Sequence, residues 1–359
     1  MSKIKIAFFL NTATSINWGS QATSAGIISL INKQYPTAEV IPLNLPKLSK
    51  FKLSRKINDA RLAKAILSND SNRVEKLLLK AKVCSSIFDH VDLVYFNGEG
   101  SIHTKSGHLI RLMALLYLYK TKGAKICALS QSVDLADSIL YQTVLTKIYS
   151  MVDVVTTREP VSCRELQYYG IDAHVLPDAA YAHPPLEPLE IQDFLKQYQL
   201  PQKYIAVTGS SALKPTSITM FSFLLSLIEE HYNCPIVFMA NAKTDIRLAH
   251  KLEKKHDFIL IKPPVRFKEA MAIIARAHLV IGGRQHPNIF AAIHRTPFIA
   301  FDGNTHKMKG VLELLDYPTE VLPWKKDRIK ILDTFKKTDQ LYSAIENIKP
   351  PKLDALPEL

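Results

Sequence analysis

The chain has 359 residues, of which 47% are hydrophobic and 22% charged, and its formal net charge is +13. This length exceeds one ordinary hydrophobic core and suits two domains, while the composition is that of a globular, soluble protein. The longest apolar stretch, Leu109 to Tyr119, is interrupted by Arg111 and is too short to cross a bilayer. It therefore predicts a buried or amphipathic helix.

The positive charge favours anionic partners: phosphorylated substrates, acidic sugars, anionic lipid surfaces or nucleic acid. Because the lysines are scattered and no basic arm interleaved with aromatic residues occurs, we predict no nucleic-acid partner. Two interpretations of the charge stay open. The basic face either associates peripherally with the inner face of a membrane or, as is more common, is a solvated lysine-rich surface. The oligomeric state is unknown from the sequence.

The N-terminal run Lys3 to Leu10 carries charge before apolar residues, as a weak signal sequence does. Asn11 and Thr12 cut the run short and no small-residue cleavage site follows, so a first parallel strand explains it better. We therefore predict a cytoplasmic protein. The cysteines lie far apart without a CxxC pair, which predicts reduced, structural thiols at Cys84, Cys127, Cys163 and Cys234.

Short apolar runs alternate with helix-length segments almost throughout, a pattern typical of βαβ units and parallel sheets. In the first half, strands are predicted at Ile4–Leu10, Glu39–Leu43, Leu93–Phe96, Lys125–Leu129, Val152–Thr156 and His174–Leu176. In the second half, they are predicted at Tyr204–Thr208, Ile236–Met239, Phe258–Ile261, Leu279–Ile281 and Phe298–Phe301. The turn at residues 17–20 opens the first helix, with Ser20 as the expected N-cap.

The fold class predicted is α/β, with two Rossmann-like lobes facing a cleft. A proline-dense interval predicts a linker at residues 184–202, between an N-terminal lobe (1–183) and a C-terminal lobe (203–330). Residues 331–359 are predicted to form a final helix, at Thr334–Ile348, and a tail that can cross back to the first lobe. Ligands of open parallel sheets collect beyond the carboxyl ends of the strands, so the loops there are expected to carry the chemistry.

In the first lobe, the loop from Asn97 to His103 follows a strand, and Glu99 or His103 can act as a general base toward a bound hydroxyl. The alternative is a tight turn with Ser101 as a helix N-cap. The loops that follow offer Ser130-Gln131-Ser132 as hydrogen-bonding groups, Arg158 as a residue that reaches the cleft or pairs with Glu159 at the surface, and Asp178 as a turn or cap residue.

In the second lobe, the strand at 279–281 runs through Gly282-Gly283 into Arg284-Gln285-His286 and a helix. Glycines permit close backbone approach, a helix N-terminus offers unpaired N–H groups and a positive dipole end, and Arg284 and His286 add charge, so we predict an anion site. A glycine-rich turn with a solvated arginine is the alternative. Ser210, after the first strand, and Lys307, at a helix start, are further anion-binding candidates, although exposed lysines are usually solvated.

No HExxH or Cys/His ligand spacing, Walker lysine motif or GxSxG elbow occurs, so we predict no metal, no cofactor and no covalent serine catalysis. Taken in order, five segments resemble the polysaccharide pyruvyltransferase family over about Asn11 to Leu315: residues 17–23, 97–100, 158–162, 177–178 and 283–286. The resemblance implies a GT-B-like fold. It also implies transfer of the enolpyruvyl group of phosphoenolpyruvate to a sugar of a surface polysaccharide, such as an exopolysaccharide or capsule, or to its lipid-linked precursor, forming a pyruvate ketal.

Arg284 and His286 match the family's R-x-H positions, associated with the phosphoenolpyruvate site, and Arg158 matches the arginine of its R-x-x-x-S element. Many members have three glycines where this chain has Gly98-Glu99-Gly100, so an acceptor-side role for Glu99 is inferred from this chain. We expect His286 as general acid, Glu99 as base, and Arg158 and Arg284 as the arginines that fix the donor. The other substrate-binding residues expected are Gln285, Lys307, Asn17, Ser20, Asn97, His103 and Ser210.

Two other functions remain open. A glycosyltransferase that uses a nucleotide-activated sugar would have the same two-lobed fold, and the anion site would serve a diphosphate equally well. A basic glycan- or lipid-binding protein with a decayed site is the non-enzymatic alternative. The sequence does not reveal the acceptor sugar or the position and stereochemistry of the ketal.

Overall fold

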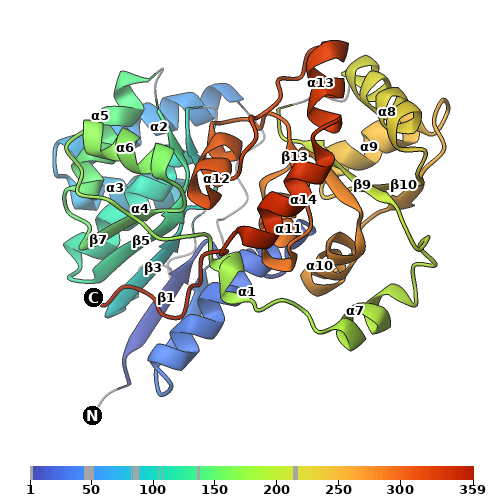
Figure 1. The fold of residues 1–359 in the computed structure, drawn as a ribbon. Coiled ribbons are helices and arrows are strands. Elements are labelled where there is room, and N and C mark those ends of the chain that lie inside the picture. Colours follow the sequence, from blue (N-terminus) through green and yellow to red (C-terminus); the bar gives the residue numbers. More distant parts are fainter. Residues whose placement is uncertain are drawn as a thin grey trace. The chain divides into compact units, whose positions relative to one another are not determined.

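The computed structural model describes residues 3–43, 52–81, 83, 89–104, 106, 108–135, 138–212 and 217–359, with no side-chain description for residues 52–57. The chain folds into two compact units (Figure 1). Unit 1 comprises Met1–Thr12, Ile27–Asp178 and Leu353–Leu359, and unit 2 comprises Ala13–Gly26 and Ala179–Lys352. Helix α1 (Trp18–Gln34) therefore contributes its first half to unit 2 and its second half to unit 1.

Unit 1 is built on a parallel six-stranded sheet in the order β2-β1-β3-β5-β7-β8. Its strands are β1 (Lys5–Phe9), β2 (Glu39–Leu43), β3 (Leu93–Asn97), β5 (Lys125–Gln131), β7 (Val154–Thr157) and β8 (His174–Val175), which confirms the six predicted strands. Central strands buried on both faces read as continuous apolar runs, and every residue of β3 is buried. A small parallel pair, β4 (Ile102–His103) and β6 (Val133–Asp134), escaped prediction.

The helices of unit 1 after α1 are α2 (Lys52–Leu67), α3 (Ser71–Lys80), α4 (Leu109–Thr121), α5 (Ile139–Tyr149) and α6 (Pro160–Tyr168). All residues from Leu109 to Tyr119 are buried, because α4 packs on β5 and is also contacted by α2, α3 and α5. The predicted helix is thus a buried one, and Arg111 within it lies 3.6 Å from Asp59 of α2. No helix among the described residues is both long and apolar enough to cross a bilayer.

Unit 2 is built on a parallel five-stranded sheet in the order β11-β10-β9-β12-β13. Its strands are β9 (Ile205–Ser210), β10 (Ile236–Met239), β11 (Ile259–Ile261), β12 (Leu279–Gly283) and β13 (Phe298–Ala300), so the five predicted strands are confirmed. The helical elements are η2 (Ala179–Ala182), α7 (Pro188–Leu195), α8 (Ile218–Tyr232), α9 (Lys243–Leu252), α10 (Phe267–Arg276), α11 (Gln285–His294), α12 (Lys307–Leu315), α13 (Arg328–Phe335) and α14 (Thr338–Asn347). Two Rossmann-like units, each with its own parallel sheet, confirm the predicted α/β class.

The C-terminal segment differs from the single helix predicted at Thr334–Ile348, since α13 ends at Phe335 and α14 begins at Thr338. The Thr338 hydroxyl donates to the Phe335 carbonyl (2.6 Å) and so satisfies an acceptor at the break. Helix α14 belongs to unit 2, whereas the tail Leu353–Leu359 belongs to unit 1. The tail is fixed there by hydrogen bonds such as that from the Tyr95 hydroxyl to the Pro357 carbonyl (3.3 Å).

Candidate active site

The carboxyl ends of β9 and β12 form the switch point of the unit 2 sheet. These strands are neighbours, yet the chain continues from β9 toward β11 on one side and from β12 toward β13 on the other. Ligands of open α/β sheets bind at such a point. The two glycines that end β12 are required there, because a Cβ on Gly282 would lie 2.1 Å from Thr208 Oγ1 and one on Gly283 would lie 2.5 Å from Ser210 Oγ.

Arg284 follows these glycines and is the N-cap residue of α11. Its side chain is 14% exposed, and one terminal nitrogen donates to Asp245 Oδ1 of α9 at 2.6 Å. Asp245 is buried, and its other oxygen accepts the Asn241 N–H (3.0 Å). The arginine is therefore held by one edge of its guanidinium group, while its Nε is buried without a hydrogen-bond partner among the described residues.

Further buried polar atoms without partners in the described part of the chain accompany Arg284. They are Gln285 Oε1, both amide atoms of Asn288 and, on the adjacent strand, Thr208 Oγ1. Buried polar groups in folded proteins are nearly always hydrogen-bonded, so these atoms around the start of α11 are candidates for bonds to a polar ligand or to water. Gln285 was predicted. Asn288 and Thr208 were not, because nothing but their burial distinguishes them.

His286 is also buried, and its Nε2 lies 3.0 Å from the Thr23 hydroxyl of α1. A Cβ on Gly19 would lie 2.3 Å from the imidazole Cγ, so the ring occupies the space that a side chain at Gly19 would need. The Thr23 hydroxyl can donate to the Gly19 carbonyl (3.3 Å) and accept from the imidazole. This arrangement suits an imidazole that carries a proton on Nε2.

The start of α1 is fastened to the same site. The Asn17 carboxamide oxygen accepts the N–H groups of Gly19 (3.0 Å) and Ser20 (3.2 Å), so Asn17 caps the helix and the predicted capping role of Ser20 is wrong. Asparagine ranks with serine as an N-cap, so the residue types alone did not decide between them. The Trp18 ring packs on Phe290 of α11, with centroids 5.5 Å apart, and the Trp18 N–H donates to Asn241 (3.1 Å).

Ser210 and Lys307 belong to a hydrogen-bonded network at the ends of β9 and β13, the two strands that flank β12. The Ser210 hydroxyl donates to the Asp302 carbonyl (2.8 Å). Lys307 begins α12, as predicted, and its ammonium group donates to Asn304 Oδ1 (2.7 Å). Both residues thus lie beside the switch point of unit 2.

In unit 1 the switch point lies between β1 and β3, and Glu99 follows β3 directly. Glu99 has a left-handed backbone (φ 40°), and its Oε1 accepts from the Thr12 hydroxyl (2.9 Å) and the Asn97 carboxamide (3.2 Å). These donors orient a partly exposed carboxylate beyond the carboxyl end of β3. The predicted tight turn is present, since the Ser101 N–H donates to the Gly98 carbonyl (2.9 Å).

The expected N-cap role of Ser101 is wrong, because strand β4 rather than a helix follows it. His103 lies in that strand, opposite Asp134 of β6, and is half-buried. The structure therefore brings Asn97 and Glu99 together through a hydrogen bond and places His103 in the small two-stranded sheet of the same unit.

Arg158 follows β7 and is 2% exposed. One terminal nitrogen donates to Asp178 Oδ2 (2.9 Å) and its Nε donates to the Ser132 hydroxyl (2.8 Å). The alternative of a surface pair with Glu159 is wrong, since Glu159 is buried and caps α6 by accepting the Ser162 N–H (2.9 Å). Asp178 is an ion-pair partner rather than only a turn or cap residue. The donor-binding role of Arg158 stays a prediction.

The thiols of Cys127, Cys163 and Cys234 are free, and Cys84 lies outside the described residues. Burial raises the pKa of all three free thiols, so they are protonated at neutral pH. A protonated thiol is a poor nucleophile, which agrees with the structural role predicted for them.

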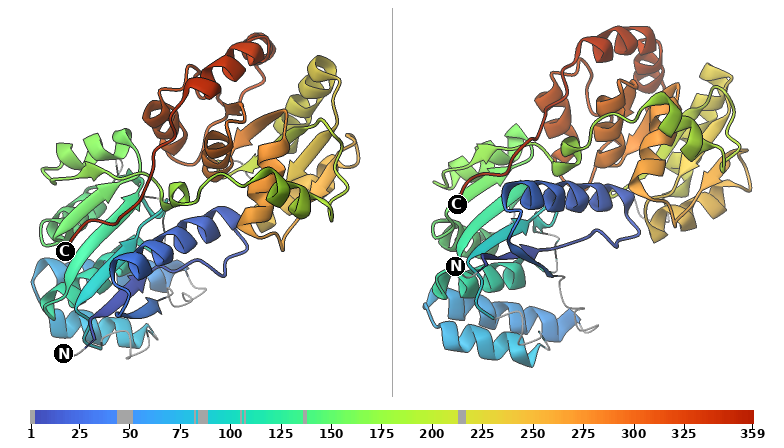
Figure 2. Two further views of the ribbon diagram at one scale, coloured as in Figure 1. Left: turned by 60° about the horizontal axis from the view of Figure 1, so that its bottom comes forward. Right: turned by 90° about the horizontal axis from the view of Figure 1, so that it is seen from below.

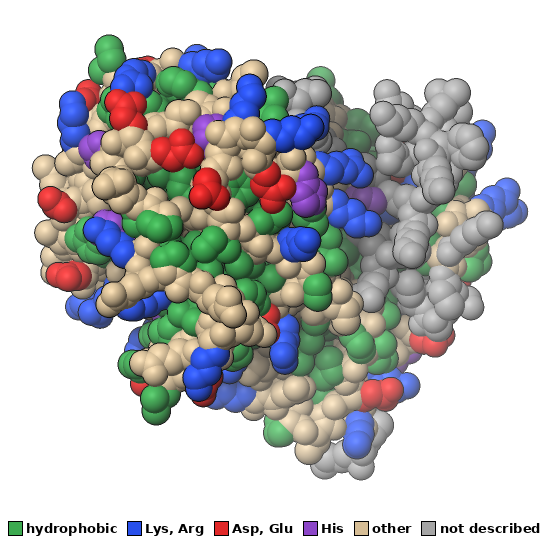
Figure 3. Space-filling model, turned by 90° about the vertical axis from the view of Figure 1, so that its right-hand side faces the viewer, with side chains coloured by type: hydrophobic (Ala, Val, Ile, Leu, Met, Phe, Trp, Pro, Cys, Tyr) green, Lys and Arg blue, Asp and Glu red, His purple; other side chains and the backbone are tan. Residues whose placement is uncertain are grey.

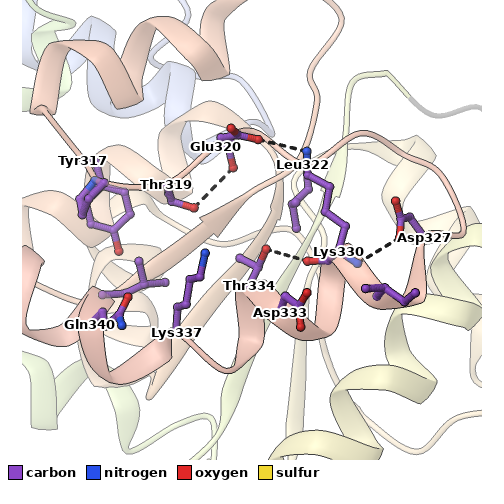
Figure 4. Close-up of a pocket in the computed structure, with 13 residues that line it drawn as sticks. Tyr317, Thr319, Glu320, Leu322, Asp327, Lys330, Asp333, Thr334, Lys337 and Gln340 are labelled. Atoms are coloured by element: carbon purple, nitrogen blue, oxygen red, sulfur yellow. Dashed lines mark hydrogen bonds and ion pairs between the residues drawn. The ribbon is translucent and has the colours of Figure 1, made fainter.

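A second concave surface of unit 2 is a groove of about 990 Å³ lined by residues of the 317–341 segment (Figure 4). Its walls come from α13, α14 and the chain that follows α12, and Lys330 pairs with Glu320 at 3.0 Å. None of the predicted site residues lines this groove, so it is separate from the site at α11.

The family model described as polysaccharide pyruvyl transferase matches residues 17–305. No curated protein is significantly similar to the chain. Solved UDP-GlcNAc 2-epimerases share its fold. The Neisseria meningitidis enzyme bound to UDP-GlcNAc has a TM-score of 0.63 and 12% identity, covering 98% of this chain and 96% of that one. The Methanocaldococcus jannaschii enzyme in complex with UDP-GlcNAc and UDP has a TM-score of 0.60 and 15% identity, covering 97% and 95%.

At such identities the likeness shows the fold alone, and that fold is GT-B. The family match has a different weight, because it spans most of the chain and includes Asn17–Thr23, Glu99, Arg158, Arg284 and His286. The chain belongs to the polysaccharide pyruvyl transferase family.

Proposed function

We propose that this protein transfers the enolpyruvyl group of phosphoenolpyruvate to a sugar of a surface polysaccharide or of its lipid-linked precursor, where it forms a pyruvate ketal. The proposal rests on the position of the R-x-H element and on the unsatisfied polar atoms around it. Arg284 and His286 stand at the start of α11, and buried polar atoms of Arg284, Gln285 and Asn288 lack hydrogen-bond partners among the described residues. A small, strongly polar donor would supply those partners.

The donor has a phosphate and a carboxylate, and three features of unit 2 suit such an anion. Arg284 uses one terminal nitrogen for Asp245, and its partly exposed side chain keeps further donors for an anion. The first N–H groups of α11 add hydrogen-bond donors and a positive dipole end. Lys307 and Ser210 lie at the ends of the strands on either side of β12. Arg284 is accordingly the principal anion-binding residue of the proposal.

Arg158 enters the proposal only through the family resemblance. Its Nε and one terminal nitrogen already donate to Ser132 and Asp178, so a donor contact would use the second terminal nitrogen. The guanidinium is almost fully buried, and any such contact would come in addition to its ion pair.

The reaction needs an acid and a base. His286 protonates the methylene carbon of phosphoenolpyruvate, and a sugar hydroxyl attacks the adjacent carbon while Glu99 takes its proton. A second hydroxyl then attacks the same carbon and gives its proton to the deprotonated His286, phosphate leaves with the bonding pair, and the ketal ring closes. Thr23 supports the acid by accepting from Nε2, and Thr12 and Asn97 orient the base.

The test is a phosphate-release assay with phosphoenolpyruvate against a panel of β-linked galactose, mannose and N-acetylhexosamine acceptors, followed by mass spectrometry of the glycan. We expect phosphate release that depends on the acceptor, together with the mass of a pyruvate ketal on the product. Phosphate release with no added mass on the glycan would refute transfer.

The fold neighbours that hold UDP-GlcNAc favour one alternative, a glycosyltransferase with a nucleotide-activated sugar. The two functions differ in which donor stabilises the protein. We expect phosphoenolpyruvate to raise the melting temperature and a UDP-sugar to leave it unchanged, since binding to the folded state alone stabilises it. The reverse result would establish the alternative.

A further inference from the structure

Helices α2 and α3 form a basic pair on unit 1, and contacts between them place them side by side (Figure 2). Residues 52–80 carry eight Lys and Arg residues against three carboxylates. Each carboxylate already has a partner within the unit: Asp59 faces Arg111 (3.6 Å), Asp70 accepts the Arg73 N–H (2.9 Å) and Glu75 faces Lys122 (3.4 Å). The excess positive charge of the pair is therefore not neutralised by its own acidic residues.

The two helices present the same outward pattern. An arginine, a lysine and a leucine follow one another at a spacing of three residues, as Arg61, Lys64 and Leu67 on α2 and as Arg73, Lys76 and Leu79 on α3. All six side chains are exposed, including Leu67 at 39% and Leu79 at 44%. Residues three apart are neighbours on a helix surface, so each helix carries a short ridge of two cations and one apolar side chain.

Between the helices lies a groove of about 580 Å³ whose cations come from both of them. It is lined by Arg61, Asp70, Asn72, Arg73, Lys76, Leu77 and Lys80. Four guanidinium or ammonium groups around one concave surface suit a phosphate group. Asp70 is the one carboxylate in the lining, and one of its oxygens is engaged with the Arg73 N–H.

A second basic row, on and just after α9 of unit 2, lacks the apolar component. Arg247, Lys251, Lys254 and Lys255 are exposed there, but no large hydrophobic residue between Lys243 and Asp257 is. On the face drawn in Figure 3, basic side chains are interspersed with acidic ones. The basic row at α9 thus has charge alone, whereas α2 and α3 combine positive charge with exposed leucines.

We propose that the α2–α3 pair binds the surface of an anionic phospholipid bilayer. The arginines and lysines contact headgroup phosphates, and Leu67 and Leu79 enter the interfacial region, as in other basic amphipathic surfaces. The sequence just before α2 agrees with this, since Lys47 and Lys50 add two cations and residues 47–51 contain no acidic residue. The inference does not depend on the donor or on the reaction.

The test is co-sedimentation of the full chain with vesicles of phosphatidylcholine alone and of phosphatidylcholine mixed equally with phosphatidylglycerol. We expect binding to the anionic vesicles only, weakened by added salt. The variant R61E/R73E/K76E/K80E should lose at least about a hundredfold in partitioning, because each cation near the surface contributes about fivefold. The matched control R247E/K251E/K254E/K255E changes the net charge equally and should lose far less.

Equal losses in the two variants would overturn the assignment to α2–α3, and absence of wild-type binding to anionic vesicles would overturn the proposal altogether. Binding of free inorganic phosphate at the groove without vesicle binding would also overturn it, because the occupant would then be a soluble anion. If the charge-reversal variant does not fold, Leu67→Ser with Leu79→Ser provides the second test. This pair should weaken the part of the binding that persists at high salt, and unchanged binding there would refute the apolar contact.

Discussion

Arg158 and Arg284 follow strands of different units, and each faces one buried aspartate, but their surroundings differ. Arg158 is 2% exposed and donates to both Asp178 and Ser132. Arg284 is 14% exposed, donates to Asp245 and has a buried Nε without a partner among the described residues. The first arginine is bonded much as a structural ion pair is, whereas the second retains bonding capacity for a ligand.

The same contrast extends to the neighbouring hydroxyls. Thr156 on β7 accepts the Ser130 N–H (2.9 Å) and donates to the Ala128 carbonyl (3.2 Å). Thr208 on β9 is equally buried, and no described residue bonds to its hydroxyl. These two threonines, at comparable strand ends, thus differ in hydrogen bonding, and the unsatisfied one lies on the strand next to the one that leads into α11.

The largest effect is expected from His286→Ala, because His286 lies at the start of α11, where the ligand is proposed to bind. Loss of a general acid should lower turnover by about a hundred- to ten-thousandfold and change the donor KM much less. Steady-state kinetics with phosphoenolpyruvate would measure both. Thr23→Val, which removes only the partner of Nε2, is the control and should have a smaller effect. Wild-type turnover in His286→Ala would show that the acid is another group.

The contribution of each Arg–Asp ion pair to stability can be tested with Asp178→Asn and Asp245→Asn. Removal of the Asp178 charge leaves a fully buried guanidinium uncompensated and should lower the unfolding free energy by about 3–5 kcal/mol. Asp245→Asn leaves the more exposed Arg284 and should cost about 1–3 kcal/mol. Urea denaturation gives both values. The reverse order would mean that the burial difference does not decide the cost.

Conservative replacement of each arginine separates binding from stability. Arg284→Lys keeps the charge but loses the planar fork, so the donor KM should rise by about ten- to a hundredfold with little change in melting temperature. Arg158→Lys should lower the melting temperature and leave the donor KM within about threefold, since its hydrogen bonds are internal. An equal rise of KM in Arg158→Lys would support the donor role that the family resemblance implies for it.

A pH effect is expected from the far end of α11, where burial lowers the pKa of His294 to about 4. An unfolded histidine titrates near pH 6.5, so between these values the unfolded state binds more protons and stability falls as the pH decreases. The loss should reach about 3 kcal/mol at pH 4, since one pKa unit corresponds to about 1.4 kcal/mol. His294→Gln should flatten the urea-midpoint profile between pH 6.5 and 4. The exposed His174→Asn is the control, and an unflattened profile in His294→Gln would assign the acid sensitivity elsewhere.

The smallest effect on stability is expected from Thr208→Val. Its hydroxyl has no partner among the described residues, so the ligand-free protein should change by less than about 1 kcal/mol while the donor KM rises. Thr156→Val is the matched control and should destabilise the protein by about 1–3 kcal/mol, because its removal leaves backbone groups unpaired. Thermal melts and kinetics of both variants decide, and equal destabilisation would remove Thr208 from the site.

Much of the fold was predictable because buried parallel strands are continuous apolar runs. All eleven predicted strands occur, in two parallel sheets. Strands β4 and β6 were missed because neither lies in an apolar run, although the equally short β8 was predicted. The break between α13 and α14 was missed because Lys336 and Lys337 do not mark a helix end by residue type.

The site was predictable in part. Glycines followed by Arg284 and His286 at a strand-to-helix turn indicated an anion site, and the structure places unsatisfied polar groups there. Thr208 and Asn288 could not be found from the sequence, since a threonine or an asparagine becomes informative only when its burial and its lack of a partner are known.

The sequence by itself determined the alternation of strands and helices, the glycines that end β12 and the charged residues at the start of α11, because these depend on residues close together in the chain. Only the tertiary structure decided that Asn17–Thr23 pack with His286 and that Arg158 pairs with Asp178 while Arg284 pairs with Asp245. The physical reason is that partners of buried polar groups are selected by strand order and helix packing, which bring together residues too distant in sequence for any local pattern to relate them.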